Sequence, residues 1–227
     1  VYKRQAEYML LPKNALIHKV SKDIPAVEAA LCEPLSCSAY AVNQTGMGME
    51  DTVVISGLGA IGMGMLQFAL LRNPKRVIGI DTNDALCEIA KKLGAAEVLN
   101  PMKEDVTKRV MELTDGVGCD IYMEATGNPA SVETGMNCLR KQGMLFIYSV
   151  FKKKAEIDLN QISEFKELRV IGGHLSPGAF PYTIDCLEKG KINAKVMVTD
   201  IFALNEIDEA MSAKKPDRVS IKTVLVP

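Results

Sequence analysis

The residues whose spacing points most directly to chemistry are three glycines. Gly57, Gly59 and Gly62 follow a β-branched run, 52–55, and precede an apolar stretch with helical spacing, 63–71. In this order the first glycine makes a tight turn and the second lets the backbone approach a pyrophosphate. The third lets helix and strand pack closely, with the phosphates over the helix N-terminus.

An acid completes this pattern. A second β-branched run, 76–80, follows the helical stretch, and Asp81 ends it, 19 residues after Gly62. A carboxylate at this distance binds the ribose hydroxyls of a dinucleotide. Its charge repels a 2′-phosphate, so Asp81 favours NAD over NADP. The alternatives are a glycine-rich turn in another α/β protein and a solvated acid at a strand end.

The segments that must position these residues alternate between strand and helix. Short apolar runs predict six strands, over residues 52–55, 76–80, 97–99, 119–124, 143–148 and 168–172. Helical spacing, with end signals such as Gly94, predicts helices over 63–71, 83–93, 105–114 and 131–139. This alternation predicts an α/β fold with a doubly wound, six-stranded parallel sheet of the Rossmann type.

Both ends of the chain depart from this alternation. Before the glycine motif we expect a strand over 6–12, extended chain over 14–20 and a helix over 25–30, and Pro34 should kink or restart the next helix. After the sixth strand we expect helices over 182–188 and 206–212 and a terminal strand over 220–226, outside the sheet. We interpret residues 1–5 as a sequencing-adaptor artefact, the alternative being a genuine segment.

The composition limits the classes of function. Lys and Arg total 27 against 28 Asp and Glu, which gives a formal net charge of -1 and no attraction to nucleic acid or an anionic membrane. The chain is 48% hydrophobic, and no apolar run is long enough to span a membrane. The six cysteines include no C-x-x-C pair, which favours reduced thiols in the cytoplasm. We also expect a homo-oligomer.

Five short segments carry a resemblance to a known family. They are Ala6-Glu-Tyr, Cys32-Glu-Pro-Leu-Ser, the loop Gly57–Gly62, Glu124-Ala-Thr-Gly and Ser220-Ile-Lys. In their order and spacing, the chain from Ala6 to Pro227 resembles the zinc-dependent medium-chain dehydrogenases, within them the sorbitol, threonine and polyol dehydrogenase branch.

The resemblance implies a division into domains. Residues 26–199 would form the NAD-binding Rossmann domain, and residues 6–25 and 200–227 would be remnants of a β-rich catalytic domain. The first half of that catalytic domain, with most of the zinc ligands, would be missing from this chain. We therefore expect the chain alone to be inactive.

The implied function is hydride transfer between NAD and a secondary alcohol of a polyol or sugar acid, with zinc as Lewis acid in the full-length protein. A small alcohol would be the only partner besides the cofactors. Two alternatives remain, a zinc-free quinone or enoyl reductase and a non-catalytic nucleotide-binding protein. Glu33 argues against the reductase, because this acid has no task without zinc.

The resemblance also implies site residues. Glu33 would be the catalytic carboxylate beside the zinc, the alternative being a helix-capping or salt-bridged acid. No metal ligand is assigned, and Cys32 and Cys37 are interpreted as packing residues. The implied cofactor contacts are Gly57, Gly59, Ala60, Ile61, Gly62, Asp81, Thr126, Ser149, Val150, Gly173, His174, Leu175 and Lys222.

Several of these contacts have simpler explanations. Thr126, Ser149 and Val150 follow predicted strands, where ordinary turn chemistry is the alternative to binding the cofactor. His174 could be an exposed loop histidine, and Lys222 a surface lysine.

Overall fold

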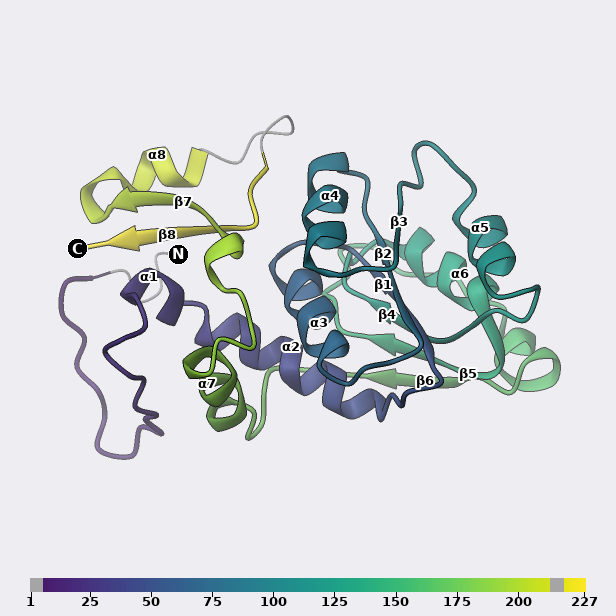
Figure 1. The fold of residues 1–227 in the computed structure, drawn as a ribbon, viewed down its shortest axis with the longest axis horizontal. Coiled ribbons are helices and arrows are strands. Elements are labelled where there is room, and N and C mark those ends of the chain that lie inside the picture. Colours follow the sequence, from purple (N-terminus) through teal and green to yellow (C-terminus); the bar gives the residue numbers. More distant parts are fainter. Residues whose placement is uncertain (1–5, 213–218) are drawn as a thin grey trace.

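The computed structural model describes residues 6–212 and 219–227. Its centre is a parallel six-stranded sheet in the order β3-β2-β1-β4-β5-β6 (Figure 1). The strands are β1 (Thr52–Ser56), β2 (Arg76–Ile80), β3 (Glu97–Leu99), β4 (Cys119–Glu124), β5 (Leu139–Ile147) and β6 (Arg169–Gly172). After β3 the chain crosses to β4 on the other side of β1, which confirms the predicted doubly wound sheet.

Helices cover both faces of this sheet (Figure 1). They are α2 (Cys32–Thr45), α3 (Ala60–Leu70), α4 (Asp84–Leu93), α5 (Val106–Leu113), α6 (Pro129–Cys138) and α7 (Phe180–Glu188). Side chains of α2, α3, α4 and α7 join one buried cluster, and those of α5 and α6 join the other.

The central strand shows why β-branched runs form this sheet. Val53 and Ile55 of β1 pack in the first cluster, and Val54 packs in the second, because successive side chains point to opposite faces. All three residues are fully buried. A strand buried on both faces is a continuous apolar run without alternation, as residues 52–55 are.

The predicted end signals act as expected in α4. The side chain of Asn83 accepts a hydrogen bond from the Ala85 amide at 2.9 Å and so caps the first turn. Gly94 ends the helix with a φ of 114°, a backbone conformation that favours glycine.

A smaller unit lies beside the main sheet (Figure 1). Strands β7 (Val198–Ala203) and β8 (Lys222–Val226) form a parallel two-stranded sheet, which confirms that the terminal strand lies outside the six-stranded one. β7 was not predicted from the sequence. Short elements complete the chain, namely α1 (Ala26–Ala29), α8 (Ile207–Ser212), a π turn (Gln161–Phe165) and 3-10 turns (Lys195–Met197, Leu204–Glu206).

The expectations for the N-terminal part have different outcomes. The predicted strand over 6–12 is wrong, because no strand of the described residues pairs with this segment and its side chains are exposed. The predicted restart at Pro34 is confirmed. α1 ends at Ala29, and α2 begins at Cys32, so Pro34 stands in a first turn, where its missing N–H costs no helical hydrogen bond.

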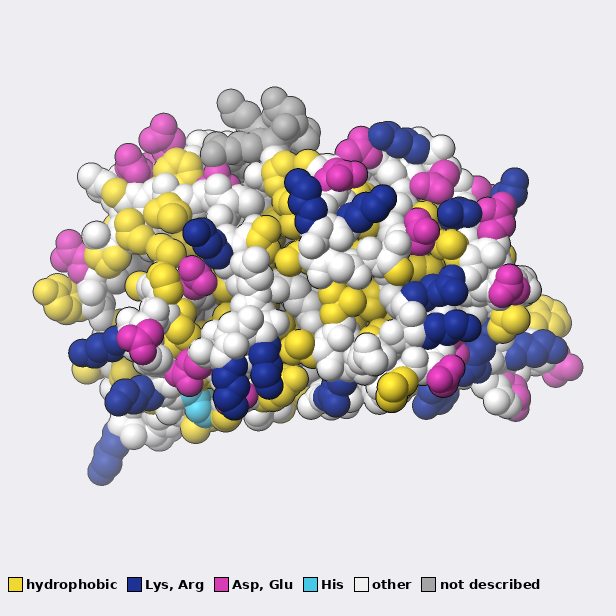
Figure 2. All heavy atoms as spheres, in the orientation of Figure 1, with side chains coloured by type: hydrophobic (Ala, Val, Ile, Leu, Met, Phe, Trp, Pro, Cys, Tyr) yellow, Lys and Arg dark blue, Asp and Glu magenta, His cyan; other side chains and the backbone are white. Residues whose placement is uncertain are grey.

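The surface carries charges of both signs. Basic and acidic side chains are interspersed over the face shown in Figure 2. Large apolar side chains are exposed in the N-terminal segment, including Tyr8, Leu10 and Leu16. Among the described residues, no helix combines the length and apolarity that crossing a membrane requires.

The packing of α6 on the sheet gives a prediction about stability. A Cβ on Gly135 would lie 2.6 Å from the ring of Tyr122, a fully buried β4 residue that cannot move aside. We expect Gly135→Ala to lower the free energy of unfolding by about 1–3 kcal/mol through overpacking, despite the better helix propensity of alanine.

Urea unfolding measures this change as a lower midpoint at constant slope. Gly48→Ala is the control, because its Cβ would meet only the Asp51 carboxylate at 3.9 Å. Equal midpoints for the two variants would show that α6 can shift away from Tyr122.

Candidate nucleotide-binding site

The loop between β1 and α3 has a shape that requires glycine at two positions. Gly57 has a φ of 93°, and a Cβ there would lie 2.9 Å from the Ala125 carbonyl group. A Cβ on Gly62 would fall 1.7 Å from the Gly57 carbonyl oxygen. α3 therefore packs directly on the loop, the geometry expected for the first and third glycines of such a motif.

Gly59 differs from these two glycines because it faces open space. It is the residue that caps the N-terminus of α3, and a Cβ built on it would meet no atom within 4 Å. No side chain caps this end of the helix. The amides of Ala60, Ile61 and Gly62, which have no partner within the helix, are thus free to bind an anion such as a pyrophosphate.

The carboxylate of Asp81 holds the same loop from the end of β2. One of its oxygens accepts a hydrogen bond from the Leu58 amide at 2.8 Å, and the other accepts one from the Asn83 amide at 2.9 Å. Each oxygen keeps a free lone pair, and Asp81 is only half-buried. The acid can therefore accept hydrogen bonds from hydroxyl groups of a ligand.

A cavity of about 430 Å³ lies beside this loop, at the carboxyl ends of β1, β2 and β4, and the predicted contacts Ala60, Ile61 and Gly62 do not line it. The strand order reverses between β1 and β4, and open α/β sheets bind ligands at such a switch point. Four of the predicted cofactor contacts, Gly57, Gly59, Asp81 and Thr126, line this cavity. Its volume is in the range of small-molecule sites.

Three hydroxyl groups form one wall of the cavity and were missed in the sequence. The Ser131 hydroxyl lies 2.9 Å from that of Ser56 and 3.3 Å from that of Tyr122, and all three residues line the cavity. Burial raises the pKa of Tyr122, so its phenol stays protonated at neutral pH. The three residues come from β1, β4 and α6, and no local pattern links them.

A buried carboxylate shapes the turn after β4. Glu124 is fully buried, and its side chain accepts hydrogen bonds from the Thr126 amide at 2.7 Å, the Gly127 amide at 3.1 Å and the Thr126 hydroxyl. A buried charge needs such donors. These hydrogen bonds hold Thr126 at the rim of the cavity. Glu124 belongs to the Glu124-Ala-Thr-Gly segment that carries the family resemblance, but it was not predicted to be a site residue.

A second group of predicted contacts lies farther along the same sheet edge, after β5 and β6. The Ser149 hydroxyl donates to the Glu124 carbonyl at 3.3 Å, and Val150 is exposed. The Gly173 amide donates to the Ile147 carbonyl at 2.9 Å. His174 and Leu175 are exposed. None of these five residues lines the cavity described above.

Glu33, the expected catalytic carboxylate, lies at the start of α2. It is exposed in the first turn of this helix. Its partner is the thiol of Cys37, whose sulfur lies 3.6 Å from a carboxylate oxygen. Burial raises the pKa of Cys37, so the thiol stays protonated and donates. The negative charge also suits a helix N-terminus.

Two other groups implied by the resemblance are Lys222 and the zinc, whose ligands were expected mostly in protein missing from this chain. Lys222 begins β8 and does not line the cavity. No three His, Cys, Asp or Glu side chains within residues 6–212 and 219–227 are grouped to hold a metal ion, so these residues do not fit zinc. The nucleotide fits, because the open face of Gly59 and the free amides beside it suit a phosphate.

The chain belongs to the zinc-binding dehydrogenase family, whose profile matches residues 60–189, from the first residue of α3 to just beyond α7. It is 40% identical over 222 residues to an erythritol/L-threitol dehydrogenase of Mycolicibacterium smegmatis, a match that covers 98% of this chain and 61% of that relative. The chain thus spans less than two thirds of the relative's length.

Solved structures agree with this assignment. The 2R,3R-butanediol dehydrogenase of Bacillus subtilis superimposes with a TM-score of 0.85 at 26% identity, over 92% of this chain and 60% of that one. A Sinorhizobium meliloti protein described as a zinc-binding dehydrogenase, bound to NADP, has a TM-score of 0.86 at 26% identity, over 92% and 61%. The family and this bound NADP support a nucleotide cofactor for the chain.

The open face of Gly59 gives a prediction that separates binding from folding. Gly59→Ala adds a methyl group where nothing in the protein lies but where a pyrophosphate would pass. We expect the affinity for the dinucleotide to fall at least about tenfold, with a change in stability below about 1 kcal/mol.

Isothermal titration calorimetry and thermal unfolding measure the two effects. Gly62→Ala, whose Cβ would fall 1.7 Å from a carbonyl oxygen, should instead lose stability. Unchanged affinity in Gly59→Ala would place the pyrophosphate away from α3.

Proposed function

We propose that this chain is the nucleotide-binding part of an NAD-dependent dehydrogenase that acts on a secondary alcohol of a polyol or sugar acid. The observation that carries the proposal is the Asp81 carboxylate, which lines the cavity beside the glycine loop with acceptor capacity to spare. The printed activities of the relatives, on erythritol or L-threitol and on 2R,3R-butanediol, support the class of substrate.

In this proposal, the residues of the chain bind and orient the cofactor. The amides at the start of α3 hold the pyrophosphate, Asp81 holds the adenosine ribose, and the segments after β5 and β6 face the nicotinamide. When bound, the nicotinamide supplies the hydride chemistry. Zinc, typical of the family, would be held by protein outside the described residues.

The same proposal covers the remaining expectations. The cytoplasm suits the six cysteines, all of them buried and free of disulfides. We also retain the assembly into a homo-oligomer as a proposal.

Cofactor choice tests the proposal directly on this chain. The charge of Asp81 should exclude the 2′-phosphate of NADP, so NAD should bind more tightly by at least about tenfold. Asp81→Asn removes the charge and should narrow this gap, mainly by weakening NAD, in calorimetric titrations with both cofactors.

Asp84→Asn is the matched control. Asp84 lies three residues further on, is exposed, and pairs with Lys103, and it does not line the cavity. The comparison of NAD with NADP is informative because the similar Sinorhizobium meliloti protein was solved with NADP bound. Tighter binding of NADP than NAD by the unaltered chain would refute the assignment.

Glu33 gives a second test, in a longer protein that supplies the half of the catalytic domain expected to be missing from this chain. Glu33→Gln keeps the shape and removes the charge. We expect kcat to fall by about tenfold to a thousandfold, the range of a general acid–base contribution, with NAD affinity unchanged.

Steady-state kinetics with a polyol substrate measure this effect, and Glu28→Gln on α1 is the control. A variant with full turnover and only a lower melting temperature would show that Glu33 is structural.

A further inference from the structure

The loop that connects β6 to α7, residues 173–179, is held at several points. It contains Gly173, His174 and Leu175, which the proposed function places against the nicotinamide. Leu175 is 57% exposed and has a φ of 53°, in the left-handed region that leucine disfavours. An exposed loop with an unfavourable backbone conformation needs contacts that keep it there.

Tyr148, the residue after β5, supplies the main contact. Its ring packs in parallel with that of Phe146, with ring centroids 6.3 Å apart. A Cβ on Gly173 would lie 2.7 Å from the Phe146 ring and 2.8 Å from the Tyr148 ring, so the loop lies directly on both rings. The Tyr148 hydroxyl then reaches the Leu175 carbonyl and donates a hydrogen bond to it.

A second contact comes from α2. The hydroxyls of Ser36 and Ser176 are 2.8 Å apart and share a hydrogen bond. Ser36 is the donor in this bond, and its hydroxyl also donates to the Glu33 carbonyl at 2.6 Å. The loop is thus fixed to the turn of α2 that carries Glu33.

Tyr148 lies where these three elements meet. Its hydroxyl interacts with the Cys37 thiol of α2 as well as with the loop. Burial raises the pKa of Tyr148, so the hydroxyl remains a donor throughout the physiological pH range.

We propose that Tyr148 is a positioning residue of the cofactor site, which holds the loop 173–179 in place as a preformed wall for the nicotinamide half of NAD. This inference rests on the proposed function. The adenosine half binds at the other side of the switch point, beside Asp81, and does not depend on this loop. Losing the hydroxyl should therefore weaken one half of the cofactor site only.

The test compares NAD with ADP-ribose, which has the same adenosine and pyrophosphate but no nicotinamide. Both ligands are titrated by calorimetry into the 227-residue chain and into Tyr148→Phe, which keeps the ring on Phe146 and Gly173. We expect the affinity for NAD to fall about three- to tenfold, the effect of one hydrogen bond, and the affinity for ADP-ribose to stay within about twofold.

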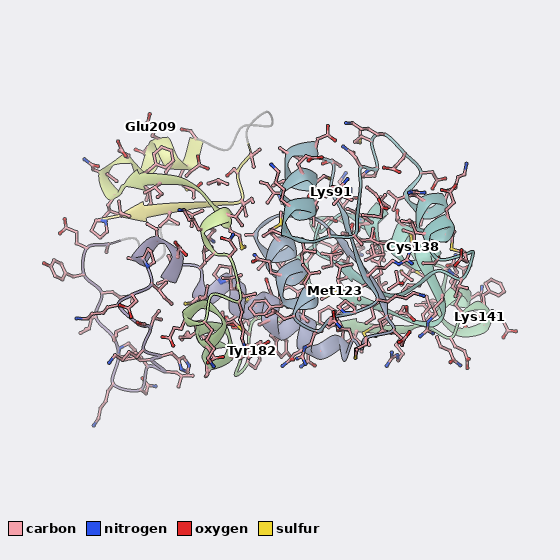
Figure 3. All side chains as sticks on the ribbon, viewed as in Figure 1. Lys91, Met123, Cys138, Lys141, Tyr182 and Glu209 are labelled. Atoms are coloured by element: carbon pink, nitrogen blue, oxygen red, sulfur yellow. The ribbon has the colours of Figure 1, made fainter. Side chains whose placement is uncertain are left out.

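Tyr182→Phe is the matched control, because Tyr182 lies on α7 (Figure 3) and its ring packs against Phe68 of α3. It should leave both affinities unchanged. Ser176→Ala removes the hydrogen bond to Ser36 and leaves Tyr148 unaltered, so it should cause the same selective loss of NAD affinity. This variant replaces Tyr148→Phe in the test if Tyr148→Phe does not fold.

The other outcomes separate the two proposals. Equal losses for NAD and ADP-ribose, or no loss for either, would overturn the positioning role of Tyr148 and leave the nucleotide site intact. Binding of neither ligand by the unaltered chain would overturn the proposed function itself.

Discussion

The close approach of α3 to the Gly57 carbonyl is the contact on which the rest of the site depends. Because Gly62 carries no Cβ, the helix can begin immediately after the loop. The same turn brings the Leu58 amide to Asp81, so the loop is closed by a carboxylate from the neighbouring strand. The absence of a side chain at Gly62 thus lets two strands and a helix meet beside the ligand cavity.

Carboxylates fix the backbone on both sides of the switch point. Asp81 accepts from the Leu58 amide after β1 and from the Asn83 amide after β2, and the buried Glu124 accepts from two amides after β4. Both acids stand at strand ends, where parallel strands leave amides without ladder partners. The cavity is therefore bordered by turns that are ordered before any ligand binds, which reduces the entropy lost on binding.

The sequence was sufficient for the features that depend on local chemistry. Buried strands such as β1 are continuous β-branched runs, and Asn83 and Gly94 mark the ends of α4. The sequence did not predict features that depend on a contact with a residue distant in the chain. The segment 6–12 has strand composition but no strand to pair with, and β7 exists through its pairing with β8. The contacts between Ser56, Ser131 and Tyr122 likewise arise only when separate elements meet.

The linked hydroxyls of Ser56, Ser131 and Tyr122 give the cavity wall a fixed polarity. Ser131 donates its only proton to Ser56, so the phenol of Tyr122 is the donor in its bond with Ser131. The proton of Ser56 is used by neither of these two bonds. Rotation about the C–O bond of Ser56 can direct this proton at the cavity without moving a heavy atom. This wall can therefore offer a donor to an acceptor atom on the ligand.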